Sequence, residues 1–335
     1  MRGTWVVLAV GGLLAVQSCS AGDQTAHSEA PGSESPLASP SVSGSHPTHP
    51  THSRRAASRS HAPSRAGSPS TPTAHRADLP TKVLVVIEEN HSFDQMRSGM
   101  PYLAGLSERY GYATQWHAIT HPSEPNYLAI AGGSTFGITD DEPPADNAPE
   151  VGQAPSVFSE ALNAGKTAAT YADAMPTPCA LADAYPYAVR HNPWTYFASQ
   201  RAACAAHDRA AESFVDAASN NRLPDVGFLI PDMLHDAHDG SLAAADAWLR
   251  TQLTPVLAST DFTSGRLVVV VTADEDDRHS DNRVLTSVLT PRVNHEVVDA
   301  PLTHYSLSRF IAQVLGVAPL GQAADAPDMV AAFGL

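Results

Sequence analysis

The sequence predicts an α/β fold, in which a doubly wound, mostly parallel sheet is flanked by helices. Four short segments are almost wholly apolar, as strands buried on both faces of a parallel sheet are. Segments with helical periodicity lie between them, and this alternation is typical of the class. Polar clusters follow the strands, at the edge where such sheets bind their ligands.

The strands are expected in order along the second part of the chain. They are KVLVVIE (82–88), TAATYA (167–172), VGFLI (226–230) and RLVVVVTA (266–273). Two segments predict helices. One begins at Ser241 as N-cap and places Leu242, Ala245, Leu249, Leu253 and Val256 on one face. The other, THYSLSRFIAQVLG (303–316), ends at Gly316.

The N-terminal residues predict export. Residues 1–19 combine Arg2 with the apolar run WVVLAVGGLLAV, which is short for a membrane span. VQSC follows and resembles a bacterial lipobox, so Cys19 is expected to carry a lipid that anchors the protein to a membrane at the cell surface. An ordinary secretory signal cleaved nearby, giving a secreted protein, is the alternative.

Residues 20–78 predict a disordered tether. They contain 14 Ser and 8 Pro and no Phe, Trp or Tyr, so they cannot bury enough apolar surface to offset chain entropy. Six histidines are scattered there; metal binding by them is one interpretation, and an incidental occurrence in a low-complexity segment is the other. The folded domain is therefore expected at 79–335.

Charge and cysteine content narrow the function of this domain. It carries 14 Lys and Arg against 31 Asp and Glu, and so acidic a surface repels nucleic acid and anionic lipid. An anionic substrate would need a local cation such as a metal ion.

If Cys19 is lipidated, Cys179 and Cys204 are the two cysteines that remain. In an oxidising compartment we expect them to form a disulfide, with two buried thiols as the alternative.

Two acidic clusters at strand ends predict a metal site. Glu89 and Asn90 follow the first strand, and Asp274 and Glu275 follow the fourth. Without a cation, these oxygen-bearing side chains would repel one another in a crevice of low dielectric constant. Oxygen ligands suit a hard or borderline divalent cation. Acids that cap helices and face solvent are the alternative.

Two further segments carry reactive side chains. Ser123 lies in HPSEPNY between two prolines that stiffen the turn, and it would need a metal or base beside it to act as a nucleophile. Asn126 could donate its amide to a phosphoryl oxygen. The segment PDMLHDAHDG (231–240) and the later His304 suit a second metal or a proton shuttle. The residues concerned are Asp232, His235, Asp236 and His238, of which His235 is the expected bystander.

Six motifs occur in register between residues 88 and 316. They are EENHSFDQ, HPSEPNYLAIAGGST, YAVRHNPWTYF, PDMLHDAHDG, VVVTADEDDRHSDNR and THYSLSRFIAQVLG. Together they resemble the bacterial and fungal phosphoesterases that include secreted acid phosphatases and non-haemolytic phospholipases C. That family belongs to the alkaline-phosphatase-like superfamily, and the resemblance covers nearly the whole folded domain.

The resemblance implies roles for individual residues. Glu89, Asn90, Asp274 and Glu275 match metal ligands, although related acid phosphatases often have Asp at the position of Glu275. Ser123 matches the nucleophile, and Asn126 a ligand of the phosphoryl oxygens. The superfamily keeps a second metal site where this sequence has Asp232, Asp236, His238 and His304. Family acid phosphatases can hold one metal, with histidines in place of the other.

His191, in RHNPW, matches a segment that the family places near the substrate. The alternative is a structural histidine packed on Trp194.

The resemblance leaves the substrate open. An acid-phosphatase-like phosphomonoesterase that forms a phosphoserine is the first expectation, because family phospholipases C usually carry extra C-terminal domains. A phospholipase C-type phosphodiesterase is the alternative, and a non-catalytic lipid-anchored binding protein is the second. His238 or His304 would protonate the leaving oxygen. The metal, the number of ions and the oligomeric state stay open.

Overall fold

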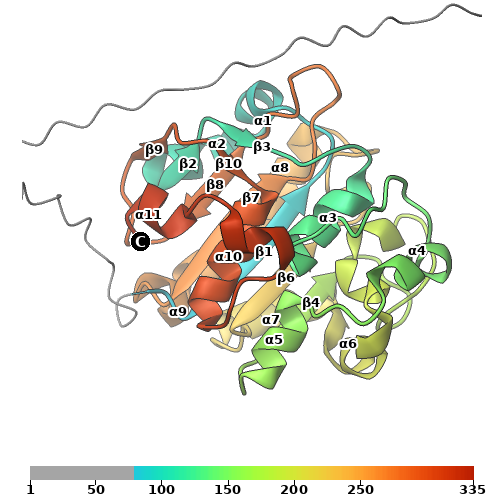
Figure 1. Ribbon diagram of the computed structural model, residues 1–335. Coiled ribbons are helices and arrows are strands. Elements are labelled where there is room, and N and C mark those ends of the chain that lie inside the picture. Colours follow the sequence, from blue (N-terminus) through green and yellow to red (C-terminus); the bar gives the residue numbers. More distant parts are fainter. Residues whose placement is uncertain (1–78) are drawn as a thin grey trace, which may run out of the picture. The chain divides into compact units, whose positions relative to one another are not determined.

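The computed structural model describes residues 79–335 (Figure 1). The predicted export signal, Cys19 and the tether lie outside the described residues. Within residues 79–335, no helix is both long enough and apolar enough to cross a membrane.

An eight-stranded sheet forms the centre of the described part. Its order is β5 (Asp208–Ala210), β4 (Ala168–Ala172), β6 (Val226–Ile230), β1 (Lys82–Glu88), β7 (Leu267–Ala273), β8 (Thr286–Leu289), β2 (Gly111–Ala113) and β9 (Glu296–Val298). The strands from β5 to β7 are all parallel. Strand β8 is antiparallel to both β7 and β2, and β9 is parallel to β2. The mostly parallel sheet is therefore confirmed.

The four predicted strands are β1, β4, β6 and β7, and their bounds agree with the prediction to within one residue. Every residue of β4, β6 and β7 is buried. The register places Val85 of β1 between Phe228 of β6 and Val270 of β7. The carboxyl ends of these strands therefore lie at one edge, and the loops that follow them meet there.

Helices cover both faces of the sheet, as a doubly wound fold requires. Helix α10 (His304–Leu315) packs against β1, α3 (Ser123–Gly132) and α5 (Val157–Asn163), and it lies in front of the sheet in Figure 1. Helix α8 (Leu242–Ala258) packs against α2 (Pro101–Arg109), α7 (Phe214–Ser219) and α9 (Thr260–Thr263).

The remaining elements are short. The helices are α1 (Phe93–Gly99), α4 (Pro144–Val151), α6 (Arg201–His207) and α11 (Met329–Phe333), and a second sheet pairs β3 (Trp116–His117) with β10 (Leu302–Thr303). Single 3₁₀ turns cover Val189–His191, Pro193–Tyr196, Ala198–Gln200, Ala211–Ser213 and Gly321–Asp325.

Both predicted helices are present with their predicted ends. Ser241 caps α8, where its side chain accepts a hydrogen bond from the Ala244 amide. The predicted inward face of α8 is buried except at Leu242, which is half-buried. Helix α10 begins with a capping box at Thr303 and ends at Gly316, whose φ of 69° is left-handed and suits glycine.

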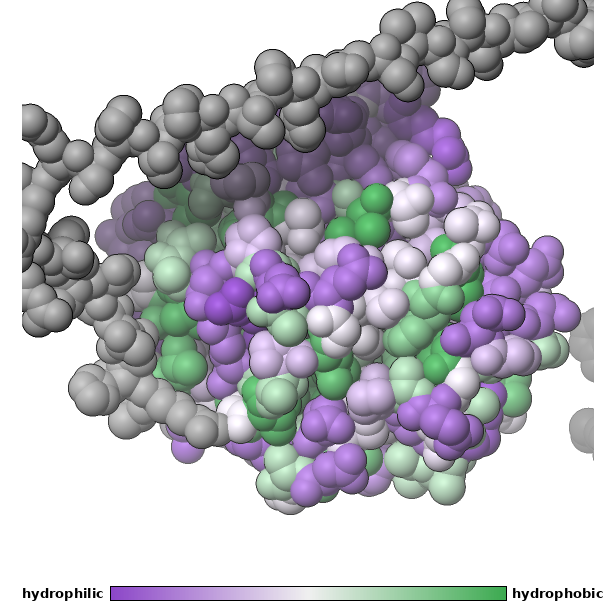
Figure 2. Space-filling view, viewed as in Figure 1, coloured by the Kyte–Doolittle hydropathy of each residue, from purple (hydrophilic) through white to green (hydrophobic). Residues whose placement is uncertain are grey.

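The predicted disulfide joins Cys179 to Cys204, with a Cα–Cα separation of 5.5 Å. It ties the loop after β4 to helix α6. On the face shown in Figure 2, hydrophobic residues appear as patches between hydrophilic ones.

Candidate active site

The loops after β1 and β7 are bonded to each other. The Asp274 amide donates to the Glu88 carbonyl oxygen at 3.0 Å. The Asn90 amide in turn donates to Asp274 Oδ1 at 3.2 Å. Asn90 has a φ of 46°, in the left-handed region that Asn tolerates better than most residues. The two acidic pairs of the sequence therefore meet at the carboxyl edge of the sheet.

Ser123 is the first residue of α3, and its side chain points at this edge. Its Oγ donates a hydrogen bond to Glu89 Oε2 at 3.1 Å. The helix N-terminus adds a positive partial charge beside the hydroxyl. Ser123 is 3% exposed, so the protein shields most of this side chain from solvent.

Two rings enclose the Glu89 carboxylate. Tyr127, one turn after Ser123 on α3, donates its hydroxyl proton to Glu89 Oε1. His191 Nε2 lies 3.4 Å from Glu89 Oε2, and its Nδ1 lies 3.2 Å from Asp236 Oδ2. The His191 and Tyr127 rings stack at 5.2 Å. Tyr127 was not predicted, although its place four residues after Ser123 puts both on one helix face.

Burial shifts the pKa values of the carboxyls near Ser123 and of His191. It raises the pKa of Asp236 to about 7 and the pKa of Asp274 to about 7. Burial also raises the pKa of Glu89 well above its usual value, and the carboxyls of Asp274 and Asp236 raise it further. The pKa of His191 is lowered by burial. We call Glu89, Asn90, Asp236, Asp274 and Glu275 the carboxylate cluster.

Glu275 lies on the Ser123 side of the cluster. Its Oε2 is 2.9 Å from His121 Nδ1 and accepts a hydrogen bond from Asn126 Nδ2 at 3.4 Å. Burial and the neighbouring Asp274 raise the pKa of Glu275 to about 9. His121 was not predicted as a site residue, although it stands two residues before Ser123 in the same motif.

Asn126 builds the turn that presents Ser123. Its Oδ1 accepts hydrogen bonds from the amides of Ile119 and Thr120, at 2.9 and 3.2 Å. Its Nδ2 donates to the Thr120 and Pro122 carbonyl oxygens at 2.9 and 3.2 Å. The amide therefore already has several partners, and its predicted contact with phosphoryl oxygens stays a prediction.

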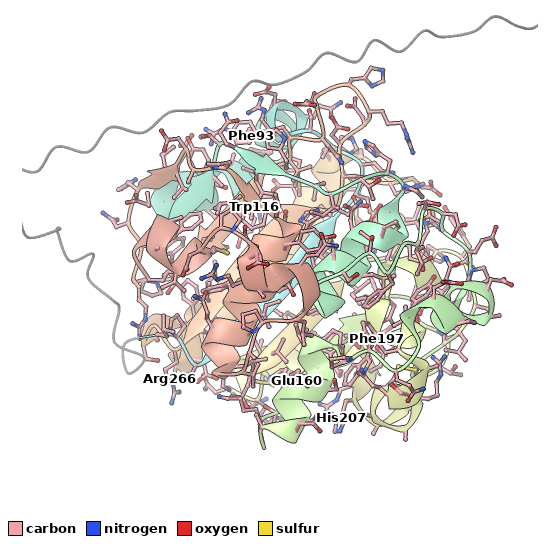
Figure 3. All side chains as sticks on the ribbon, in the orientation of Figure 1. Phe93, Trp116, Glu160, Phe197, His207 and Arg266 are labelled. Atoms are coloured by element: carbon pink, nitrogen blue, oxygen red, sulfur yellow. A yellow bond between two sulfur atoms is a disulfide. The ribbon has the colours of Figure 1, made fainter. Side chains whose placement is uncertain are left out.

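His304 lies behind Asp274, away from Ser123. Its Nε2 donates to the Asp274 carbonyl oxygen at 2.6 Å, and its Nδ1 accepts from Trp116 Nε1 at 3.2 Å. Trp116, labelled in Figure 3, lies beside helix α10. Burial lowers the pKa of His304 to about 4. His304 is fully buried, whereas His238 lines the cavity that also contains Ser123, so the geometry favours His238 over His304 as a proton donor.

Asp232 also lies apart from the carboxylate cluster. Its Oδ1 accepts hydrogen bonds from the amides of Leu234 and His235 and lies 3.1 Å from His235 Nδ1. Asp236, four residues on, contacts His191 instead. The predicted pair of Asp232 and Asp236 is therefore divided between two places.

A cavity of about 340 Å³ opens onto Ser123. It is lined by Asn90, Pro122, Ser123, Asp141, His238, Glu275, Asp276, Asp277 and Arg278. His238 Nδ1 lies 2.8 Å from Asp239 Oδ1, and its Nε2 lies 3.4 Å from Arg190 Nη2. A small substrate in this cavity would contact Ser123, the imidazole of His238 and the guanidinium of Arg278.

The Phosphoesterase family model matches residues 96–318. The chain belongs to the Phosphoesterase family. Phosphatidylinositol-3-phosphatase from Mycobacterium tuberculosis is 34% identical over 261 residues, which cover 76% of this chain and 84% of that protein. This phosphoesterase is accordingly a hydrolase that acts on phosphoric esters, as the sequence predicted.

Two fungal relatives are named acid phosphatases. The enzyme from Aspergillus fumigatus is 29% identical over 62% of this chain and 49% of its own length. The phosphate-repressible acid phosphatase from Penicillium chrysogenum is 31% identical over 66% of this chain and 55% of its own length. The phosphoesterase therefore spans about half of each fungal protein.

Solved structures share the fold at low identity. The lipoteichoic acid synthase LtaP from Listeria monocytogenes matches with a TM-score of 0.51 and 11% identity, over 75% of this chain and 77% of that one. A Bacteroides thetaiotaomicron protein, solved in work on glycosaminoglycan metabolism, matches with a TM-score of 0.52 and 10% identity, over 76% of each chain. The predicted α/β fold, with a mostly parallel sheet flanked by helices, is therefore shared with solved structures.

Proposed function

We propose that the protein is a metal-dependent phosphomonoesterase of the acid-phosphatase type that acts through a phosphoserine at Ser123. One observation carries this proposal. The Ser123 hydroxyl lines the cavity and hydrogen-bonds to Glu89 Oε2, inside a group of carboxyls that burial has deprived of water.

The residues present fit a divalent cation. Asp274 Oδ2 and Asn90 Oδ1 are buried without a hydrogen-bond partner among residues 79–335. Such oxygens are costly to bury unless something outside the protein satisfies them. Glu89, Asn90, Asp274 and Glu275 would hold the ion, whose chemistry is to lower the pKa of a bound hydroxyl and to neutralise phosphoryl charge.

His191 supports a single ion. Its ring stands between Glu89 and Asp236, with one nitrogen toward each carboxylate. The side-chain ligand atoms of these three residues lie within 4.8 Å of one another. We interpret a histidine between these two carboxylates as the counterpart of the histidines that replace a second ion in one-metal members of the family.

The chain's own residues then divide the work. Ser123 passes its proton toward Glu89 Oε2 and attacks phosphorus in line, and the bond to the leaving oxygen breaks. The helix N-terminus of α3 and Arg278, which lines the cavity, favour the negative charge on the phosphoryl oxygens. His238 donates a proton to the leaving oxygen. Water then hydrolyses the phosphoserine and frees Ser123.

The relatives favour a monoester substrate. Those described above are named as a phosphatidylinositol-3-phosphatase and as acid phosphatases. A phosphoinositide headgroup is the second candidate substrate, on the strength of the mycobacterial relative. The phospholipase C-type phosphodiesterase remains the alternative reaction.

Replacing the nucleophile tests the mechanism. Ser123→Ala should lower the kcat for p-nitrophenyl phosphate by about 10³-fold or more, because the covalent step is lost. The midpoint of urea unfolding should stay near that of the wild type. Full activity in the folded variant would contradict the nucleophile assignment. A panel with bis-p-nitrophenyl phosphate and phosphatidylcholine separates monoesterase from phosphodiesterase activity.

Removing the ion tests the metal assignment independently. EDTA should suppress turnover by the wild type, and added Mn²⁺ or Zn²⁺ should restore it. Glu89→Ala should lose one bound ion per chain when metal is counted by plasma mass spectrometry. A Glu89→Ala protein that kept both its metal and its rate would show that Glu89 is not a ligand.

A further inference from the structure

Three potential metal ligands meet beside the carboxylate cluster without belonging to it. Asp173 directly follows β4, and Asp232 lies two residues after β6. Strands β4 and β6 are parallel neighbours, with Ala172 opposite Ile230. The two carboxylates therefore leave the sheet at the same edge.

His235 completes this set because a tight turn brings it back. Asp232 Oδ1 accepts hydrogen bonds from the amides of Leu234 at 3.0 Å and His235 at 3.1 Å. His235 Nδ1 lies 2.8 Å from Asp173 Oδ2 and 3.1 Å from Asp232 Oδ1. The ring stacks on Trp248 of α8 at 5.7 Å and 15°. Backbone, sheet and indole thus hold the three donors in place.

Both carboxylates of this set lie against the same imidazole nitrogen. Two carboxylates converge on one ring nitrogen, and a single Nδ1–H can serve only one of them fully. A divalent cation can be shared by all three donors. An imidazole nitrogen with two carboxylate oxygens suits zinc or manganese, whereas calcium prefers oxygen alone.

Exposure fits a site that also takes up water ligands. The side chains of His235, Asp173 and Asp232 are 39%, 18% and 6% exposed. Their ligand atoms lie within 4.8 Å of one another. Solvent can therefore reach the open side of the site while the loop and sheet hold the other side.

We propose that Asp173, Asp232 and His235 bind a divalent transition-metal ion at a site separate from the carboxylate cluster. Asp232, predicted as a ligand of a second catalytic ion, belongs to this site instead. The ion ties the loop 231–240, which carries Asp236 and His238, to the end of β4. The proposal does not depend on the proposed function, because binding is measured directly.

Zinc counting tests the site. Full-length wild type, His235→Ala and Asp173→Asn are equilibrated with Zn²⁺, and bound metal per chain is counted by plasma mass spectrometry. His207→Ala is the matched control, because His207 (labelled in Figure 3) also stacks on an indole, that of Trp194, at 6.3 Å. Because the His207→Ala protein retains residues 20–78, comparison with it also corrects for zinc bound by the histidines of that segment. Each test variant should bind one ion fewer than the control.

A second background separates this ion from the catalytic one. In the Asp274→Asn protein, adding His235→Ala should again lower the count by one ion per chain. The reason is that the affinity of the Asp173–Asp232–His235 site for zinc should fall by about 100-fold or more. If the loss disappears in this background, the ion belongs to the carboxylate cluster and the proposal is wrong. Equal zinc counts in wild type, His235→Ala and Asp173→Asn would also overturn it.

Thermal unfolding provides a readout that needs no count. Zn²⁺ should raise the Tm of wild type and His207→Ala more than the Tm of Asp173→Asn, since an ion that binds only the folded state stabilises it. Asp173→Asn keeps the size of the side chain, so it is the variant to use if His235→Ala folds poorly. An equal Zn²⁺-induced rise in all three proteins would contradict the site.

Discussion

His191 and His304 are both buried histidines, 1% and 0% exposed, and both come from motifs that suggested a role in the reaction. Their surroundings differ. His191 faces two carboxylates, whereas His304 lies between a backbone carbonyl oxygen and an indole N–H. The partners of His191 are carboxyls, which can gain or lose a proton, whereas those of His304 are fixed dipoles. The motif alone therefore locates a histidine without deciding its chemistry.

The largest expected effect is on the His191 side of this comparison. His191→Ala should lower kcat by about 10²- to 10³-fold, because the ring that lies against Glu89, the hydrogen-bond acceptor of Ser123, is lost. His191→Gln, which keeps one donor, should lose less. Steady-state kinetics on folded, metal-loaded protein measures this. A His191→Ala kcat within threefold of wild type would remove the distinction between the two histidines.

His304 should matter for stability. His304→Ala leaves the Asp274 carbonyl oxygen and the Trp116 N–H without their partners, which should lower the free energy of unfolding by about 3 kcal/mol. His304→Gln can restore one bond and should recover part of that loss. Urea unfolding gives these values. Unchanged stability together with a 100-fold loss of kcat in His304→Ala would make His304 a catalytic residue after all.

The smallest effect is the part of the pH dependence of stability that His304 causes. Its pKa is about 4 in the folded protein and ordinarily 6.5. The unfolded chain binds more protons between these values, so the folded state loses stability as the pH falls from about 6.5 toward 4, by about 2 kcal/mol between pH 7 and pH 5. His304→Gln should lack this loss, whereas the carboxyls and His191 contribute equally to both proteins. Urea unfolding at pH 7 and pH 5 makes the comparison, and equal losses would contradict it.

Much of the fold follows from local sequence, because long buried strands and capped helices have strong patterns. Strands β1, β4, β6 and β7 and helices α8 and α10 were predicted to within about a residue at most ends. The short strands β2, β5, β8 and β9 were not predicted. They have three or four residues each, so they form by pairing at the sheet edge and carry little periodicity of their own.

The sequence by itself determined which residues could form a site, since Glu89, Asn90, Asp274 and Glu275 stand at strand ends that a parallel sheet must bring together. Only the tertiary structure decided which of the later residues join them. It placed Asp236 against His191, turned Asp232 toward Asp173 and His235, and put His304 behind Asp274. The reason is physical: strand order fixes where a loop begins, whereas the direction of each side chain depends on turns and packing contacts between segments far apart in the chain.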